Sequence, residues 1–187
     1  MIRLTFLLRR KPDASLAQFQ RYWREVHGPL VAKHATTLNI LRYVQVHTLD
    51  DPVNQQLPGA RGAMEPPYDG VAELWWTSRE TLISTFTGAA GQAASRELLE
   101  DEAKFIDLPN SPLWLNYEYP QVNAAPEDLV AREYSPLVKL FFCLRHPSNL
   151  TLEEAQLYWR TSHGPTIRAV ATGMRMRRYL QVHRYED

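Results

Sequence analysis

The stretch YWREVHGP at residues 22–29 occurs a second time in the chain, as YWRTSHGP at residues 158–165. Each copy is followed at the same spacing by another matching run, RYVQVH at residues 42–47 and RYLQVH at residues 178–183. The alignment extends over 44 residues without a gap, and 19 of these positions are identical. Self-similarity at a fixed offset, here 136 residues, indicates a duplicated module.

The repeated octet predicts a distortion in a helix. An apolar helical face carrying Trp23 ends at Gly28 and Pro29. Proline disfavours helical geometry at the residue before it and can itself begin a new helical turn. We therefore expect the helix to break at this pair, with His27 beside carbonyl groups that lack intrahelical partners. At such a break the imidazole can leave the packed face and reach a cavity.

Length and charge exclude several classes of protein. The 187 residues allow one domain or one domain plus a fraction. Equal numbers of basic and acidic residues, 21 each, give a net charge of zero, and the short basic cluster Arg175, Arg177 and Arg178 would be split between two faces of a strand. We therefore expect no nucleic-acid partner.

Membrane insertion and disulfide bonding are not expected either. No stretch approaches the roughly 18 apolar residues of a membrane span, and the apolar N-terminal run is too short for a signal peptide. The single cysteine, Cys143, lies in an apolar run, which predicts a buried thiol in a reducing compartment. A cytoplasmic location follows from these observations.

Periodicity and capping signals define the elements of the first copy. Alternating or apolar runs predict strands at residues 2–8, 38–49, 70–76 and 113–119. Helices are expected after residues 15, 78 and 92, and a long loop rich in Pro and Gly at residues 50–69. Ser15 with Gln18, and Thr151 with Glu154 in the second copy, form capping boxes that begin both repeated helices alike.

This order of elements predicts an α+β fold, a ferredoxin-like plait (βαββαβ) with an antiparallel sheet. We expect this domain at residues 1–120, a linker at residues 121–136 and a partial second repeat at residues 137–187. The partial repeat would be a βαβ unit with strands at residues 138–145 and 174–185. Because half of the second module has no counterpart, an exposed sheet edge would favour association with another subunit. We expect a homodimer.

The second strand carries different side chains on its two faces. Period two sends Tyr43, Gln45 and His47 to one face and Val44 and Val46 to the other. We expect the two valines to pack beneath a helix and the polar face to point elsewhere. That polar face could be a solvated sheet surface or the wall of a ligand cavity.

Four stretches together resemble the EthD-domain family. They are the octet at residues 22–29, YVQVH at residues 43–47, YDGVAELW at residues 68–75 and DEAKFID at residues 101–107. The resemblance covers residues 1–120 as a full domain and residues 137–187 as a partial one.

The resemblance implies a dimeric α/β-barrel fold with a ligand cleft between sheet and helices. EthD proteins are named for a role in degrading an ether, and other members resemble dehydratases or cyclases of polyketide pathways. Relatives of the same fold include isomerases and monooxygenases, so the fold does not select a reaction.

Three titratable residues are candidates for catalysis. His27 can take and give a proton near neutral pH, although a role in capping its own helix would explain the same motif. His47 is the second candidate. Glu73, between bulky apolar neighbours, could have a raised pKa and carry a proton, or it could form a salt bridge with Arg42 or Arg9.

The candidate substrate-binding residues are Tyr43, Gln45, Trp75 and Trp23. The equivalent positions of the second repeat are His163, Tyr179, Gln181 and His183. Tyrosine and glutamine could orient a carbonyl or hydroxyl group, while the tryptophans could line an aromatic pocket or simply pack.

No zinc-binding, nucleotide-binding or serine-hydrolase motif occurs, so we expect neither a metal nor another cofactor. The sequence therefore predicts a cofactor-independent acid/base enzyme of the dehydratase, cyclase or isomerase type. Its partner would be a small hydrophobic or aromatic metabolite, for example a polyketide-like one. The alternatives are a non-catalytic hydrophobic-ligand-binding or accessory protein of an oxidative degradation pathway and a cofactor-free oxygenase.

Overall fold

The computed structural model describes all residues of the chain except 60, 63, 126–128, 133 and 186–187. The chain forms two compact units, Met1–Tyr117 with Arg184–Asp187, and Glu118–His183. None of the described helices is both long enough and apolar enough to span a bilayer.

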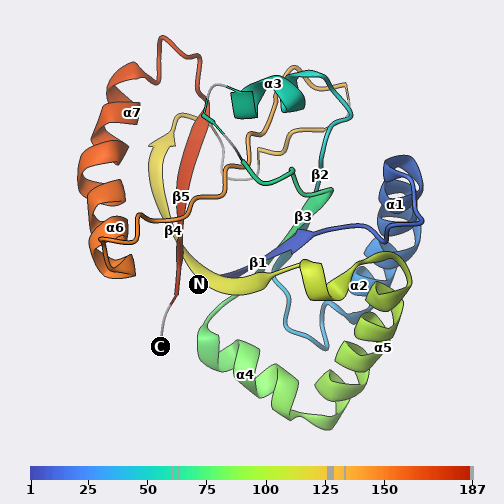
Figure 1. The fold of residues 1–187 in the computed structure, drawn as a ribbon. Coiled ribbons are helices and arrows are strands. Elements are labelled where there is room, and N and C mark those ends of the chain that lie inside the picture. Colours follow the sequence, from blue (N-terminus) through green and yellow to red (C-terminus); the bar gives the residue numbers. More distant parts are fainter. Residues whose placement is uncertain (60, 63, 126–128, 133, 186–187) are drawn as a thin grey trace. The chain divides into compact units, whose positions relative to one another are not determined.

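The first unit is an antiparallel sheet with helices (Figure 1). Its elements in chain order are β1 (Ile2–Leu8), α1 (Leu16–Tyr22), the π-helical η1 (Trp23–His27), α2 (Gly28–His34), β2 (Arg42–His47), α3 (Val53–Gly59), β3 (Gly70–Trp76), α4 (Arg79–Thr87), α5 (Ala89–Phe105), the 3₁₀ turn η2 (Leu108–Asn110) and β4 (Leu113–Asn123). The strand order is β2-β3-β1-β4, and each of these pairs is antiparallel. This is the ferredoxin-like arrangement that the sequence predicts.

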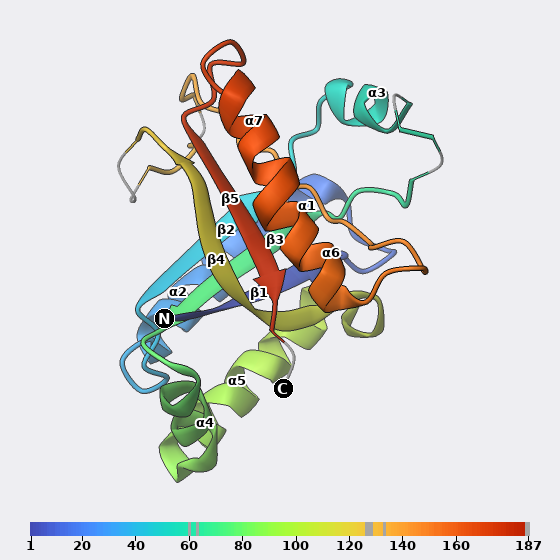
Figure 2. The ribbon, with the colours of Figure 1, turned by 90° about the vertical axis from the view of Figure 1, so that its left-hand side faces the viewer.

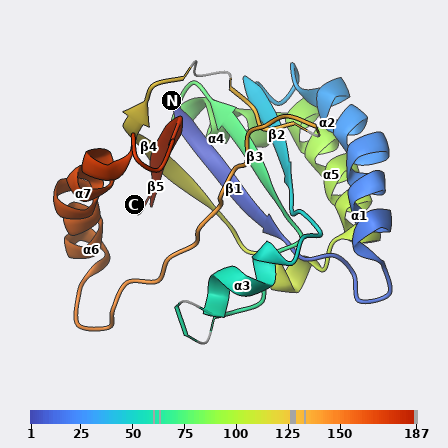
Figure 3. The ribbon, with the colours of Figure 1, turned by 90° about the horizontal axis from the view of Figure 1, so that it is seen from above.

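The main core lies between the sheet and the helices α1 and α5, which lie with α2 on one side of the sheet (Figure 3). Phe6 and Ala72 face each other across β1 and β3, and they pack in the same cluster as Phe19, Trp23 and Phe105 from the helices. The alternation of strand side chains places this apolar set on the helix-facing side.

Polar residues occupy the opposite face of the same strands. Arg3 of β1 forms an ion pair with Glu73 of β3, and both side chains are almost fully buried. Asn116 of β4 donates to the hydroxyl of Thr5 at 3.0 Å. Because period two separates these residues from Phe6 and Ala72, the sheet has an apolar side and a side with buried charge.

The second unit repeats part of the first. It contains the C-terminal part of β4, α6 (Leu152–Tyr158), the π-helical η3 (Trp159–His163), α7 (Gly164–Val170) and β5 (Arg178–Arg184), and β5 is the hydrogen-bonded neighbour of β4. Helices α6 and α7 run alongside β5 (Figure 2). Both predicted capping boxes are confirmed, at Ser15 and at Thr151.

The strand predicted at residues 138–145 does not form, so the partial repeat contains no first strand. In the first unit the equivalent strand, β1, pairs on both sides with β3 and β4. The described part of the second unit contains no counterpart of β3, and an alternating pattern alone does not make a strand without hydrogen-bonded neighbours. Cys143 lies in this segment and is exposed, so the prediction of a buried thiol is also wrong.

Other differences are smaller. The predicted loop at residues 50–69 contains the short helix α3, and β2 is confined to residues 42–47. Strand β4 continues through Pro120 to Asn123. Proline does not end a strand where its missing N–H is not needed for pairing.

The glycine at position 70 provides a test of core packing. A Cβ atom there would lie 2.5 Å from Cζ3 of the buried Trp23 ring. We expect Gly70→Ala to lower the free energy of unfolding by about 1–3 kcal/mol, because the indole must move in a close-packed core. Gly88→Ala is the matched control, since its Cβ would meet nothing closer than 3.7 Å. Urea denaturation measures both, and equal stability of the two variants would contradict this packing.

Candidate functional site

The repeated octet forms a π-helical turn within a continuous helical run. Backbone angles at Gly28 remain helical, and its N–H donates to the carbonyl of Trp23, five residues earlier. In a regular α-helix the ring of Pro29 would clash with the carbonyl of Glu25, four residues earlier. The wider π turn relieves this conflict, so the prediction of a break is wrong and the distortion is a π-bulge.

Side chains of β2 hold this bulge. Gln45 Nε2 donates to the Trp23 carbonyl oxygen at 2.8 Å and to the Tyr43 hydroxyl at 3.1 Å. The Trp23 indole N–H donates to the same hydroxyl at 2.8 Å. His47 Nε2 lies 3.1 Å from Gln45 Oε1, and its ring lies 4.6 Å from the Trp23 ring.

The polar face of β2 therefore points toward the helices, which is the reverse of the prediction that placed Val44 and Val46 beneath a helix. The reason is that the π-bulge and the indole present polar groups that need partners inside the protein. Tyr43, Gln45 and His47 supply them, and the buried hydrogen bonds outweigh the cost of removing these side chains from water.

Two residues of this network have pKa values far from their ordinary ones. Burial lowers the pKa of His47 to about 4, with the nearby charge of Arg24 adding to the effect. Burial raises the pKa of Tyr43 to about 12. The amide of Gln45 fixes the tautomer of His47, because its oxygen can only accept from an Nε2–H.

His27 lies on the neighbouring turn and faces α5. Its side chain is buried, with a relative exposure of 4% for the residue, and its ring packs 5.2 Å from that of Phe105. Nδ1 lies 2.9 Å from Asp101 Oδ2. Asp101 also accepts from the Tyr22 hydroxyl at 2.8 Å and from Lys104 Nζ at 3.1 Å.

Asp101 defines the protonation of the imidazole. Burial alone would raise the pKa of Asp101. The hydrogen bonds from Tyr22, His27 and Lys104 outweigh burial and hold the pKa of this carboxyl group below its ordinary value. The carboxylate is therefore ionised near neutral pH and can only accept, so Nδ1 of His27 carries the hydrogen and Nε2 presents its lone pair.

Glu102 lies on the Nε2 side of the same ring. Its Oε1 is 3.9 Å from His27 Nε2. Burial, together with the negative charge of Asp101, raises the pKa of Glu102 to about 7. Burial lowers the pKa of His27, in spite of the hydrogen bond and charge of Asp101. Near neutral pH the protein thus places an uncharged imidazole next to a carboxyl group that can hold its proton.

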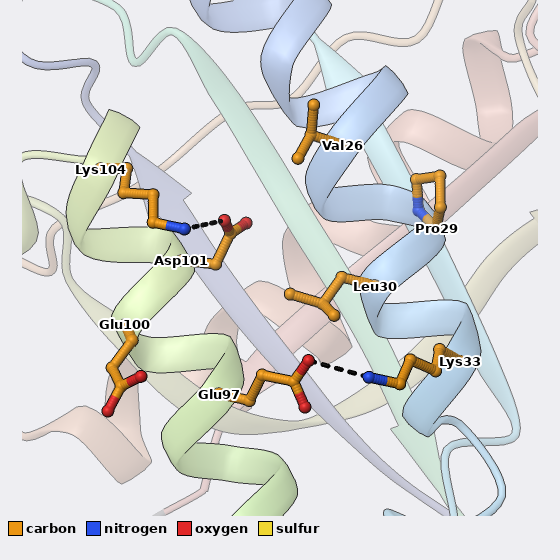
Figure 4. A pocket seen from close by; sticks show the side chains of 8 residues that line it. All are labelled: Val26, Pro29, Leu30, Lys33, Glu97, Glu100, Asp101 and Lys104. Carbon is orange, nitrogen blue, oxygen red and sulfur yellow. Dashed lines mark hydrogen bonds and ion pairs between the residues drawn. The ribbon is translucent and has the colours of Figure 1, made fainter.

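Two grooves between the first helical run and α5 are lined in part by residues that contact His27. The larger, about 500 Å³, is lined by Val26, Pro29, Leu30, Lys33, Glu97, Glu100, Asp101 and Lys104 (Figure 4). The smaller, about 230 Å³, is lined by Lys11, Asp13, Ala14, Gln18, Phe19, Tyr22, Lys104 and Phe105. The bond between Tyr22 and Asp101 links one residue from each lining, whereas His27 and Glu102 themselves line neither groove.

Two predicted site residues lie away from His27. Glu73 is on the opposite face of the sheet, where its ion-pair partner is Arg3. Trp75 is on that same face, with the guanidinium groups of Arg3 and Arg42 5.2 and 5.1 Å from its ring. The structure therefore does not bring Glu73 and Trp75 together with the histidine cluster.

The second unit repeats the network around the bulge. Gln181 Nε2 donates to the Trp159 carbonyl oxygen at 2.7 Å, and Trp159 Nε1 donates to the Tyr179 hydroxyl at 3.1 Å. His183 lies 3.2 Å from Gln181 Oε1 and stacks on Trp159, and burial lowers its pKa to about 4. His163, by contrast, is exposed. Within the described part of its unit no carboxylate contacts it.

Tyr22, Asp101 and Glu102 were not among the candidates from the sequence. The stretch DEAKFID at residues 101–107 contributes to the family resemblance, but its sequence does not mark Asp101 as a partner of His27. Asp101 and His27 are separated by 74 positions in the sequence, so no local pattern reveals their contact. Packing of α5 on the first helix is what brings them together.

The family profile described as "EthD domain" matches residues 11–109, which is more than half of the chain. The chain belongs to the EthD family. No curated protein matches it.

Solved structures of two EthD proteins are similar to this chain. One, an EthD family protein from Bacillus halodurans, has 18% identity and a TM-score of 0.42, covering 63% of this chain and 97% of that one. The other, an EthD-like protein from Ralstonia eutropha, has 16% identity and a TM-score of 0.41, covering 61% and 87%. SnoaB, a cofactor-independent oxygenase from Streptomyces nogalater, has 14% identity and a TM-score of 0.34, covering 72% and 98%.

The displaced pKa of His47 predicts a loss of stability in acid. Its pKa is about 4 in the folded protein and near the ordinary 6.5 when unfolded, so the unfolded chain binds the proton first. The contribution of neutral His47 to the free energy of unfolding is complete above pH 6.5 and is lost as the pH falls toward 4.

Urea denaturation between pH 7 and pH 5 measures this loss. We expect His47→Gln to reduce the pH dependence. An identical pH dependence in wild type and His47→Gln would contradict the assignment.

Proposed function

We propose that this EthD-family protein is a cofactor-independent acid/base enzyme of the dehydratase, cyclase or isomerase type. Its substrate would be a small aromatic or polyketide-like ketone. The observation that carries the proposal is His27, held at Nδ1 by Asp101 at 2.9 Å and approached at Nε2 by Glu102 at 3.9 Å. Homodimerisation and a cytoplasmic location stay predictions from the sequence.

His27 is the proposed base. An ionised Asp101 orients the ring and stabilises the imidazolium that forms when Nε2 takes a proton. The proton would come from a carbon beside the substrate carbonyl, where removal leaves an enolate. This is the first step that dehydration, isomerisation and cyclisation share.

Glu102 is the proposed acid, because a pKa of about 7 lets it hold a proton near neutral pH. In a dehydration, His27 removes the proton of the C–H bond, and the electron pair of that bond forms the new C=C bond. The C–O bond breaks as Glu102 protonates the leaving hydroxyl. Water is released and no oxidant is required. His27 then returns its proton to the Glu102 carboxylate, and the 3.9 Å separation suits this step.

Tyr43 is the proposed donor to the substrate carbonyl. Its hydroxyl oxygen accepts hydrogen bonds from Trp23 and Gln45, so its own hydrogen is left to donate. Burial raises the pKa of this hydroxyl to about 12, so it stays protonated at neutral pH and can donate. A donor hydroxyl aimed at an enolate oxygen stabilises it.

His47 and Glu73, the acids suggested by the sequence, are less suited to this role. Burial keeps His47 uncharged above about pH 4. The ion pair with Arg3 holds Glu73 on the other face of the sheet. The proposal therefore assigns His47 to support of the π-bulge and gives the acid role to Glu102.

The β-hydroxyketone 3-hydroxy-1-tetralone is a direct probe, since loss of water followed by tautomerisation yields fluorescent 1-naphthol. We expect turnover whose kcat/KM falls by about 10²–10⁴-fold in His27→Ala and Asp101→Asn. Glu80→Gln, at an exposed position on α4, is the matched control and should retain full activity. Binding of the ketone without conversion would contradict the proposal and favour the binding-protein alternative, and oxygen consumption would favour the oxygenase.

The pH dependence of kcat/KM separates the two roles. The base must be unprotonated and the acid protonated, so activity should fall above about pH 7 as Glu102 ionises. Activity should also fall in acid as His27 gains a proton. This acid limb should lie below pH 6.5, the ordinary pKa of histidine, because burial lowers the pKa of His27. Glu102→Gln should reduce the rate and remove the alkaline limb. An alkaline limb that persists in Glu102→Gln would exclude this residue as the acid.

A further inference from the structure

The smaller of the two grooves in the first unit has an aromatic wall. Its lining includes Phe19 and Tyr22 of α1 and Phe105 of α5. The Phe105 ring packs 5.6 Å from that of Phe19 and 5.1 Å from that of Tyr22. The two phenylalanines are buried and Tyr22 is half-buried, so neighbouring side chains hold these rings in place. A planar ring can pack against such a wall.

Lys11 is held at this groove by its backbone. Its N–H donates to the Phe105 carbonyl oxygen at 3.1 Å, and the preceding Arg10 forms a β-bridge with Ile106. Among the residues that the structure describes, the ammonium group of Lys11 forms neither an ion pair nor a hydrogen bond, not even with the nearby Asp13. A cationic donor without a partner therefore lies beside the aromatic wall.

The two grooves differ in the charge of their linings. The larger is lined by two lysines and three carboxylates, and both lysines donate to a carboxylate, Lys33 to Glu97 and Lys104 to Asp101. The smaller is lined by two lysines and one carboxylate, that of Asp13. A negatively charged ligand is therefore favoured in the smaller groove and disfavoured in the larger.

Size and hydrogen-bonding capacity narrow the ligand further. The smaller groove has a volume of about 230 Å³, below the roughly 300–1,000 Å³ of pockets for drug-sized ligands, so one or two fused rings suit it. Gln18 also lines this groove. Its Oε1 accepts from the N–H of Ser15 at 2.9 Å, and its Nε2 makes no hydrogen bond within the described part of the chain. This amide is a second donor for an anionic oxygen.

We propose that the smaller groove binds a small aromatic carboxylate. The ring of the ligand packs against the aromatic wall, and its carboxylate accepts from Lys11 and from the amide of Gln18. His27 and Glu102 do not line this groove, so the site is separate from the candidate catalytic groups. It binds its ligand whether or not those groups react.

The probe is 2-naphthoate, and 2-naphthamide is its uncharged counterpart of the same shape. Isothermal titration calorimetry with the full chain should give a Kd below about 1 mM for the acid and at least about fivefold weaker binding of the amide. We expect Lys11→Met to weaken binding of the acid about five- to tenfold, because it removes a charge-assisted hydrogen bond and keeps the length of the side chain. Lys33→Met makes the same change in the larger groove and should leave the affinity unaltered.

A second variant tests the groove by its shape. Ala14→Leu adds bulk at a half-buried lining position and should weaken binding of 2-naphthoate at least about tenfold. Circular dichroism should show that all variants are folded. An affinity of Lys11→Met or of Ala14→Leu equal to that of wild type, equal binding of acid and amide, or a Kd above about 1 mM for the acid would overturn the proposal.

Discussion

The carboxylate of Asp101 is the contact on which the candidate site depends. It accepts from Tyr22, His27 and Lys104, so it joins α5 to the helical run that contains the π-bulge. The same contact fixes the tautomer of the imidazole, and the charge of Asp101 adds to burial in raising the pKa of the adjacent Glu102. The buried carboxylate of Asp101 therefore both holds α5 against the first helical run and orients the proposed base.

The two copies separate structural from chemical roles. The hydrogen bonds among Trp23, Tyr43 and Gln45 recur around Trp159 in the second unit, whose described residues include no counterpart of α5. This network belongs to the π-bulge itself and accompanies it wherever the motif folds. The arrangement around His27 occurs only where α5 supplies carboxylates, which is why the proposed activity is assigned to the first unit.

Local patterns in the sequence predicted much of the fold. Alternation, capping boxes and the repeat led to the ferredoxin-like order and to both helix starts, because these depend on neighbouring residues. The direction of the polar face of β2 and the strand at residues 138–145 were mispredicted, since they depend on partners elsewhere in the chain. For the site, the sequence identified His27 but not Asp101 or Glu102, which only tertiary packing places beside it.

The most direct test of the account is the protonation of His27, observed by long-range ¹⁵N–¹H correlation on ¹⁵N-histidine-labelled protein at pH 7. We predict a neutral ring that carries its hydrogen on Nδ1, and loss of that fixed tautomer in Asp101→Asn. A ring protonated on Nε2, or an imidazolium at this pH, would contradict it.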